Sequence, residues 1–339
     1  MIKLNKSLLL VASLMMAVST YAQKTYKAKS PGKKNEVVFS LTKSGQPQYS
    51  FSSNGKAVIQ PSLLGFEFQE NKKMTDGFKV VTTEEKSADK VWEQPWGEFK
   101  KIRDHHNELI VHLQETAGEK RLVDIIFRVF DDGLGFRYHF PKQPNLDKVK
   151  ISNEITQFTF PFDNDVWSIP VHRDNSYYES TYKKSPMSKT DTINTPATFE
   201  TKDKLFVAIH EAALTDFASM TLLKSKGNQY KSDLVPWRDG VKVYAQTPFN
   251  TPWRTIIVGT KPGDLVTSTL MLNLNEPSKI EDTSWIEPSK YIGIWWGMHL
   301  ETFTWGQGPK HGATTANTKR YIDFAAEHGL DGVLVEGWN

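Results

Sequence analysis

The residues best suited to chemistry lie close to the end of the chain. Two adjacent tryptophans, Trp295 and Trp296, are followed by His299, and a second group near the terminus contains Glu336 and Trp338. An indole ring covers the apolar C–H face of a sugar, while carboxylates and imidazoles bond its hydroxyl groups. These five side chains therefore indicate a carbohydrate-binding site. The competing interpretation is that the tryptophans fill a core and that the glutamate forms a structural ion pair.

A β-α-β unit is predicted to position these side chains. The apolar runs "YIGIWW" (291–296) and "DGVLVE" (331–336) are typical of strands covered on both faces. The intervening segment 314–329 has helical periodicity, and Thr314 or Thr315 can cap it. Such a unit builds a parallel sheet, so the residues that follow its two strands meet at one edge.

This unit cannot enclose a core by itself. Two parallel strands leave both sheet edges unpaired, and one helix covers only part of one face. We therefore expect the other strands of a barrel or doubly wound sheet to follow Asn339. In β/α barrels the loops at the carboxyl ends of the strands carry the active site. The connection 297–313 is longer than the usual ~2–6 residues, which favours a functional loop.

Catalysis of glycoside hydrolysis needs two carboxyl groups that flank the scissile bond. In the β-α-β segment only Glu336 is placed clearly at a strand end. We therefore assign no catalytic residue in this chain and expect both catalytic carboxylates downstream of Asn339. A dinucleotide-binding interpretation is disfavoured, because "GMHLETFTWGQG" lacks the required glycine spacing directly after the first strand.

Most of the chain before this unit has the period-two pattern of β-strands. Short alternating runs are separated by turn residues such as Asp131, Asp132 and Gly133, and helical periodicity is scarce. Clear examples of such runs are "EVVFSLT" (36–42), "LIVHLQE" (109–115), "LVDIIFRVF" (122–130) and "WRTIIVG" (253–259). About 260 residues of short strands predict a large β-sandwich.

Three polar stretches in the β-rich region contain candidate metal ligands. Glu179, within "HRDNSYYESTY", can give a carboxylate oxygen to a hard cation, although a solvated loop is the commoner role of such a stretch. His105 and His106 point to opposite faces of a strand, so they do not easily share one metal. The stretch "IHEA" (209–212) lacks the second histidine of a zinc-protease helix.

The composition of the chain indicates where the protein is located and which classes of partner it does not bind. The chain has 42 Lys and Arg against 39 Asp and Glu, and without a basic stripe we expect no nucleic-acid partner. Residues 1–22 have the charged start, apolar middle and small final residues of a secretory signal cleaved near Ala22. The chain contains no Cys, so neither a disulfide nor a lipoprotein anchor is expected. We therefore expect a soluble periplasmic protein without a membrane anchor.

Taken together, the motifs resemble glycoside hydrolase family 97, the exported α-glycosidases common in Bacteroidota. The matching stretches follow the family's order and cover nearly all of the chain after the predicted signal. They are "PWGE" (95–98), "FDDGLGFRYHF" (130–140), "IHEAAL" (209–214), "QTPFNTPWRTIIVG" (246–259), "LNLNEPSKI" (272–280), "KYIGIWWGMH" (290–299) and "ANTKRYIDFAAEHGLDGVLVEGWN" (316–339).

The resemblance implies a mainly β fold. A β-super-sandwich of the galactose-mutarotase type would span 23–288, and the first β-α-β unit of a truncated (β/α)₈ catalytic barrel would span 289–339. The sandwich is expected to dock on the barrel of the same chain. The resemblance also implies a Ca²⁺ ion near the site. Glu179, in the Tyr-rich loop after "WSIP", matches a calcium ligand of the α-glucosidase branch.

The implied function is removal of terminal α-linked glucose from oligosaccharides by an inverting, calcium-dependent, exo-acting enzyme. The ending "VLVEGWN" (333–339) is closer to the inverting α-glucosidase branch than to the retaining one. The alternatives are a retaining α-galactosidase of the same family and a non-catalytic carbohydrate-binding β-sandwich. The carboxylates that would distinguish these functions are expected after Asn339. The 339 residues alone are therefore expected to be inactive.

Overall fold

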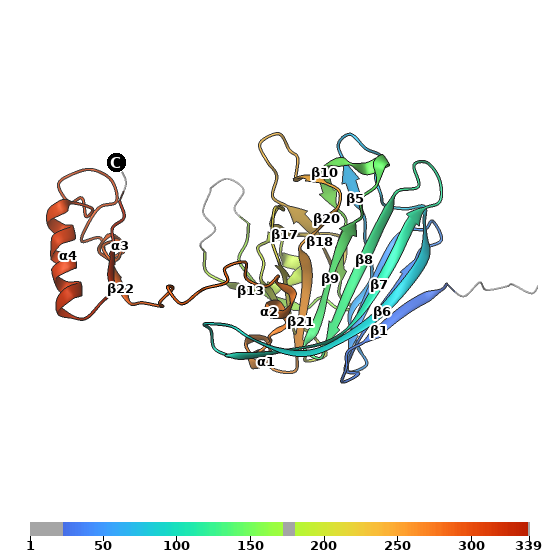
Figure 1. Cartoon of the computed structure of the whole chain (residues 1–339), viewed down its shortest axis with the longest axis horizontal. Helices are drawn as coiled ribbons and strands as arrows, with labels where there is room; N and C mark the ends of the chain where they lie inside the picture. Colours follow the sequence, from blue (N-terminus) through green and yellow to red (C-terminus); the bar gives the residue numbers. More distant parts are fainter. Residues whose placement is uncertain (1–22, 172–179, 338–339) are drawn as a thin grey trace, which may run out of the picture. The chain divides into compact units, whose positions relative to one another are not determined.

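The computed structural model describes residues 23–171 and 180–337. The chain forms two compact units, Met1–Glu276 and Pro277–Asn339, whose elements are labelled in Figure 1. The first is mainly β, and the second contains a small β-α-β arrangement. The predicted secretory signal over 1–22 lies outside the described residues. Among the residues described, no helix is long and apolar enough to cross a bilayer.

One sheet of the first unit joins the earliest strands to strands from the middle of the chain. Its neighbouring strands pair antiparallel, and the strand predicted at 36–42 is confirmed as β2, where buried side chains largely alternate with partly exposed ones. In spatial order the sheet contains β1 (Thr25–Lys29), β2 (Asn35–Leu41), β3 (Pro47–Ser53), β4 (Lys56–Leu63), β11 (Gln157–Thr159), β18 (Gln229–Leu234), β17 (Met220–Lys224) and β14 (Thr192–Ile193).

A larger antiparallel sheet contains the strands predicted at 109–115, 122–130 and 253–259, which are confirmed within β7, β8 and β21. Its spatial order is β13 (Lys183–Pro186), β12 (Asp165–Ser168), β15 (Ala197–Glu200), β16 (Phe206–Ala212), β21 (Trp253–Gly259), β9 (Gly133–Phe140), β8 (Leu122–Phe130), β7 (Lys101–Glu115) and β6 (Phe78–Glu93), with β20 (Phe249–Asn250) beside β9. The predicted turn at Asp131 and Asp132 is also confirmed, because it joins β8 to β9.

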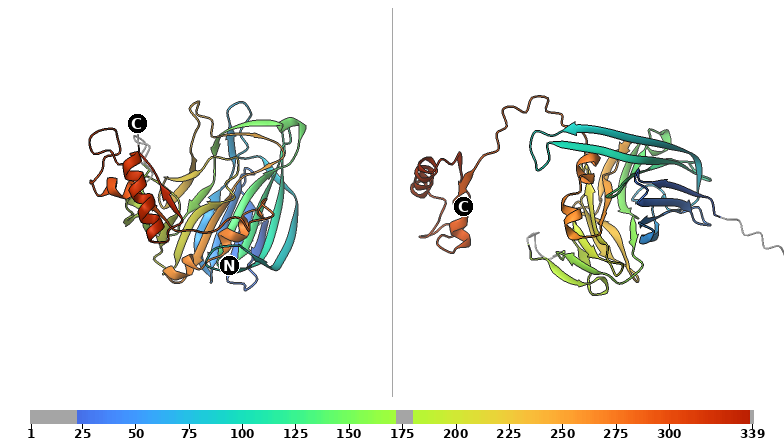
Figure 2. Two further views of the ribbon diagram at one scale, coloured as in Figure 1. Left: turned by 60° about the vertical axis from the view of Figure 1, so that its left-hand side comes forward. Right: turned by 90° about the horizontal axis from the view of Figure 1, so that it is seen from below.

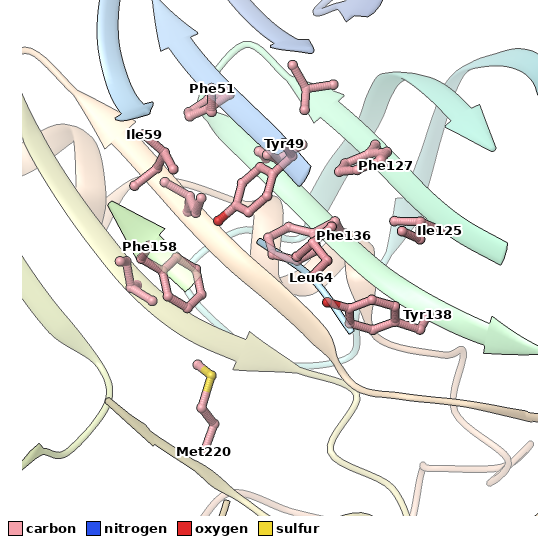
Figure 3. Close-up of a cluster of buried hydrophobic side chains, with 14 of the residues drawn as sticks. Tyr49, Phe51, Ile59, Leu64, Ile125, Phe127, Phe136, Tyr138, Phe158 and Met220 are labelled. Atoms are coloured by element: carbon pink, nitrogen blue, oxygen red, sulfur yellow. The ribbon is translucent and has the colours of Figure 1, made fainter. Parts of the chain in front are cut away.

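Side chains from both sheets share one hydrophobic core. Tyr49 on β3 lies 4.7 Å, centroid to centroid, from Phe136 on β9, and Phe136 lies 5.9 Å from Phe127 on β8. Figure 3 shows these rings pointing toward one another between the sheets. Offset and tilted aromatic contacts of this kind add to the stabilisation from burial. The predicted mainly β fold with sandwich-like sheets is therefore confirmed.

A small antiparallel sheet and two short turns complete the first unit's framework. The sheet has the order β19 (Val243–Gln246), β10 (Lys148–Glu154) and β5 (Phe66–Phe68). The 3₁₀ turns are η1 (Pro144–Leu146) and η2 (Met187–Lys189). The β18–β19 connection carries the chain from the first large sheet to this small one.

Two short helices cover the outer face of the larger sheet. They are α1 (Pro262–Val266) and α2 (Leu270–Leu274). Every residue of β21 is buried, because Ile256 faces the main core while Trp253 packs outward with Leu270 and Leu274. A strand covered on both faces reads as continuous hydrophobic burial, which accounts for the run at 253–259.

The second of these helices also holds the long β6–β7 hairpin. Asn273 accepts a hydrogen bond from Trp92 Nε1 at 2.8 Å and donates to the carbonyl of Arg103 at 3.0 Å. Figures 1 and 2 show the hairpin as a long ribbon that runs past α1 and α2. One amide side chain thus joins both strands of the hairpin to the outer helix.

A charged cluster lies inside the sandwich. Arg254 on β21 is fully buried and donates to Glu154 Oε1 and Oε2 at 2.9 and 2.6 Å, and to Glu211 Oε2 at 2.5 Å. Thr156 also donates to Glu154 at 2.7 Å, and the Met220 N–H donates to Glu211 at 3.0 Å. Buried charges are tolerated when they are paired and hydrogen-bonded. The cluster ties β10, β16 and β21 together.

We expect Glu211→Gln to change how stability depends on pH. Burial raises the pKa of the Glu211 carboxyl above its ordinary value, against the opposing effect of Arg254. Because the folded state holds this proton more tightly than the unfolded chain, the Glu211 contribution falls as pH rises from the unfolded pKa through the raised folded value. Urea unfolding from about pH 4 to about pH 7 should show this decline in the wild type and a flatter profile in the variant. Parallel profiles would contradict the expectation.

The second unit contains a parallel strand pair and two helices. β22 (Tyr291–Gly293) pairs with β23 (Gly332–Leu334), and the helices are α3 (Trp295–His299) and α4 (Thr315–Glu327). Thr314 accepts a hydrogen bond from the Asn317 N–H, which confirms a capped helix at this position. The order strand, helix, strand is the one predicted for the end of the chain.

Candidate functional site

The two parallel strands end at the same edge of their sheet. Gly293 lies opposite Leu334, and the N–H of Ile294 donates to the Leu334 carbonyl at 3.1 Å. The segments that follow both strands therefore begin side by side. This places α3 next to residues 335–337, as the predicted β-α-β unit requires.

The short helix α3 carries an aromatic and histidine cluster. Trp295 lies 5.5 Å from Trp296 and 5.3 Å from His299, with ring planes close to perpendicular. Trp305 from the following loop lies 5.4 Å from His299. Trp296 is 56% exposed and His299 is exposed, whereas Trp295 is half-buried. The helix thus presents a tryptophan face and an imidazole to solvent, with a further ring beside them.

Apolar contacts on the other side of α3 hold the cluster in place. Ile294 and Met298, one helical turn apart, are both buried. A Cβ on Gly297 would lie 2.5 Å from the ring of Phe303, and Gly312 packs against the same ring. Glycine at both positions therefore lets the Phe303 ring pack closely against the side of the helix that carries Ile294 and Met298.

The strand predicted over "YIGIWW" is wrong in its second half. The strand ends at Gly293, and Trp295 and Trp296 lie on α3 instead. Helical bonds such as the one from the Leu300 N–H to the Trp296 carbonyl, at 3.0 Å, satisfy the backbone there. Tyr291 is 60% exposed, so the described residues do not themselves supply the expected cover on both faces. Two strands and one helix offer too little surface to bury either face of the sheet.

The second strand leads to Glu336, which is exposed. Within the described part of the chain this carboxylate has no hydrogen-bond or ion-pair partner, so the alternative of a structural ion pair gains no support. Gly337 packs tightly against the far end of the loop, since a Cβ there would lie 2.5 Å from Ala313 and 3.0 Å from the His311 ring. Trp338, the remaining predicted sugar contact, lies outside the described residues.

His311 has a defined orientation beside this segment. Its Nδ1 lies 3.1 Å from the Gly306 carbonyl, which can only accept, so Nδ1 carries a proton. In the neutral ring Nε2 is then an acceptor. The loop therefore supplies a second imidazole at the edge where Glu336 emerges.

The chemistry of this edge suits binding more than bond cleavage. Indole rings can cover the C–H face of a pyranose while His299 and Glu336 bond its hydroxyls. A glycoside hydrolase needs two carboxyl groups in fixed positions, and among the described residues Glu336 is the one strand-end acid of this unit.

The predicted metal ligand Glu179 lies outside the described residues. Among those described, no group of three or more His, Asp or Glu side chains could hold a metal ion. His106 is buried with Nδ1 2.6 Å from Asp104, whereas His105 is about one-third exposed, so the two rings point apart as predicted. Burial lowers the pKa of His106 despite that carboxylate.

Comparison with known proteins identifies relatives of both units. The family model for the N-terminal domain of glycosyl hydrolase 97 matches residues 28–277, and the glycoside hydrolase 97 model matches residues 295–339. A retaining α-galactosidase of Bacteroides thetaiotaomicron is 25% identical over 99% of this chain and 53% of its own length. The chain thus spans about half the length of the curated relatives it matches.

A solved structure is more similar still. A glycoside hydrolase family 97 enzyme from Pseudoalteromonas sp. strain K8, in complex with panose, has 44% sequence identity and a TM-score of 0.87. The match covers 93% of this chain and 47% of that one, and the same enzyme has also been solved with acarbose. The two family models together match the sandwich and the segment that contains the strand-end cluster, so the chain belongs to glycoside hydrolase family 97.

Proposed function

We propose that this chain is the N-terminal part of an exo-acting α-glycoside hydrolase that removes terminal α-linked glucose from oligosaccharides. The observation that carries the proposal is the cluster of Trp295, Trp296 and His299 at the carboxyl ends of two parallel strands. The glucose specificity is supported by the 44% identity to an enzyme solved with panose and acarbose. In this proposal β22, α4 and β23 begin a (β/α)₈ barrel that continues beyond Asn339.

The exposed apolar surface of the second unit supports the barrel. Tyr291 and Leu334 on the strand pair are 60% and 41% exposed, Val335 directly after β23 is 46% exposed, and Phe324 on α4 is 43% exposed. A barrel buries its strands on both faces and leaves no unpaired edge. Further strands would therefore cover these side chains, and the sandwich would dock on the completed barrel within the same chain.

The proposed reaction inverts the anomeric centre. A carboxylic acid protonates the glycosidic oxygen while a second carboxylate activates water on the opposite face of the sugar. Both groups would come from barrel strands after Asn339. In this chain Trp295, Trp296, His299, Glu336 and Trp338 would hold the terminal sugar. These side chains would hold the terminal sugar in one orientation, and such positioning supplies part of an enzyme's rate enhancement.

We further propose a Ca²⁺ ion with Glu179 as one ligand, the other ligands coming from later barrel strands. Carboxylate oxygens are the ligands that this cation prefers. Residues 1–22 would direct export to the periplasm. Because the chain contains no cysteine, it would fold there without disulfide bonds. Oligosaccharide would be the partner, with neither nucleic acid nor membrane bound.

A second candidate is a retaining α-galactosidase. It is favoured by the curated relatives, one from Bacteroides thetaiotaomicron named a retaining α-galactosidase and one from Streptomyces bingchenggensis named a probable one. Their identities of 25% and 28% are well below the 44% of the enzyme solved with panose. We therefore place the glucosidase first. A carbohydrate-binding sandwich without catalysis is the third candidate.

A proton NMR time course of panose hydrolysis tests the proposal. The enzyme that includes the complete barrel should release glucose, and β-glucose should appear before mutarotation produces the α-anomer. Early α-glucose would favour a retaining mechanism. Failure to release glucose at all would contradict the glucosidase assignment. The 339 residues alone should release none, because one strand-end carboxylate cannot serve as both acid and base.

A further inference from the structure

The sandwich unit contains a groove whose residues and strands are not those of the strand-end cluster. It consists of two adjoining hollows of about 580 and 600 Å³, which share Asp216, Phe217 and Tyr244. The first hollow reaches Trp237, and the second reaches Arg137. All of the lining residues belong to the first unit. No step of the proposed hydrolysis uses them.

Two aromatic rings border the first hollow and remain open to solvent. Trp237 is 66% exposed and Tyr244 is 50% exposed. Exposed aromatic rings gathered in one hollow, unlike a single exposed side chain, mark a candidate binding surface. Trp237 lies within the β18–β19 connection and Tyr244 lies on β19, and both line the first hollow.

The turn that presents Trp237 is held by its own hydrogen bonds. The Trp237 N–H donates to the Val241 carbonyl at 2.8 Å, and the Gly240 N–H donates to the Trp237 carbonyl at 3.0 Å. Asp239 accepts from the Val241 N–H at 3.1 Å and also accepts from the Tyr244 hydroxyl. One carboxylate thus links the turn to the second ring. The backbone at Trp237 and the hydroxyl of Tyr244 are therefore held by the same turn, which limits the order that is lost when a ligand stacks there.

The second hollow contains an arginine that lacks a full set of partners. The side chain of Arg137 is 14% exposed and stacks 4.3 Å from the ring of Trp253. Its one ionic contact is Glu276 Oε1, 3.5 Å from Nη1, and within the described residues Nε has no partner. Arg128, which also lies over the ring of Trp253, has a 2.7 Å bond from Nε to Glu108.

Nε is itself fully buried, so a ligand in the hollow would meet the partly exposed remainder of the Arg137 side chain, which is a cationic donor. Asn250 adds a second donor beside it, because its Oδ1 is taken by His139 at 2.8 Å and its amide N–H groups have no partner among the described residues. The second hollow therefore offers donors, and the first offers aromatic rings. Sugars require both, since each ring has an apolar face and a rim of hydroxyls.

The charges along the groove point to a neutral ligand. Asp216 and Glu276 are matched by Arg137 and Lys242, so the lining has no excess of either sign. A nucleic acid or an acidic polymer would need a basic surface. A membrane-binding surface would combine exposed apolar side chains with an excess of basic ones.

We propose that this groove is a second carbohydrate-binding site, in which Trp237 and Tyr244 stack against sugar rings and Arg137 and Asn250 donate to hydroxyls. The ligand class is a neutral oligosaccharide, and its assignment as an α-glucan rests on the proposed function. The site retains the polymer while its free end is processed elsewhere. It requires no catalytic group, so binding persists in a protein that does not hydrolyse.

Calorimetric titration of the 339-residue chain with maltotriose tests the site. Trp237→Ala should weaken the affinity about tenfold or more, as loss of a central aromatic contact does. Trp237→Phe keeps an aromatic face and should recover part of it. The matched control is Trp285→Ala, because Trp285 is 70% exposed but lies outside the groove, and it should leave the affinity unchanged. Circular dichroism checks that each variant is folded.

A second comparison separates this site from the strand-end cluster. In Trp296→Ala the groove should still bind maltotriose, so the heat that Trp237→Ala removes should persist. Loss of binding in Trp296→Ala but not in Trp237→Ala would overturn the proposal, as would failure of the wild type to bind. A third outcome would also overturn the proposal. If another part of the complete enzyme covers the groove, that enzyme will not show the heat of maltotriose binding that depends on Trp237 in the 339-residue chain. Panose hydrolysis measured in parallel reports separately on the proposed function.

Discussion

Replacement of Arg254 by alanine is expected to lower the free energy of unfolding by about 3–5 kcal/mol. The substitution removes the cation that pairs with Glu154 and Glu211 inside the sandwich, where the side chains of these two glutamates are 0% and 5% exposed. Without it, both must either remain charged in an apolar interior or take up protons on folding. Either outcome costs free energy, because burial favours the uncharged form.

The comparison that makes this prediction specific is Arg103→Ala. Arg103 also forms a two-pronged pair, with bonds of 2.7 and 2.8 Å to Asp89, but the two side chains are 59% and 54% exposed. Water can replace the lost partner there, so we expect no resolvable change in stability. Urea unfolding followed by circular dichroism measures both variants. A similar loss in the two would contradict the assignment of Arg254 as the central tie of the core.

Gly133→Ala is the second substitution for which we expect a large effect, about 3 kcal/mol or more in unfolding free energy. Gly133 opens β9 with φ of +156°, and a Cβ there would lie 2.2 Å from the Ile256 carbonyl oxygen and 3.0 Å from Ile257 Cα. Both obstacles are backbone atoms of the adjacent strand, so no side-chain rotation relieves the clash. The strand pair itself would have to separate.

Gly118→Ala provides the matched control for this effect. Gly118 also has a positive φ, +68°, but a Cβ there would meet nothing within 4 Å. We expect only the backbone cost of that conformation, about 1–2 kcal/mol. The difference between the two variants in thermal or urea unfolding isolates the clash. Equal losses would show that the close approach of β9 to β21 relaxes without cost.

Most of the period-two strands could be predicted because one face lies in the core, whereas β21, which was predicted with them, is buried on both faces. The run 122–130 becomes β8 with nearly perfect alternation of buried and partly exposed residues. The charged core could not be predicted in the same way. Glu154, Glu211 and Arg254 meet only when three strands far apart in the sequence come together, and no local pattern records that pairing.

The strand-end cluster was predicted by residue type, but its local structure was not. The run at 291–296 has high strand propensity, and the spacing of Ile294 and Met298, which marks a helical turn, is too short to outweigh it. The groove on the sandwich gave no local signal either. Trp237 lies in a turn and Arg137 on β9, and the topology alone brings them to one surface.

The most direct test of the account is hydrolysis of 4-nitrophenyl α-glucoside and α-galactoside by the enzyme with the complete barrel, with and without a calcium chelator. The account predicts that the α-glucoside is cleaved, that the chelator abolishes cleavage, and that added Ca²⁺ restores it. Turnover of the α-galactoside alone, or of neither substrate, would contradict it.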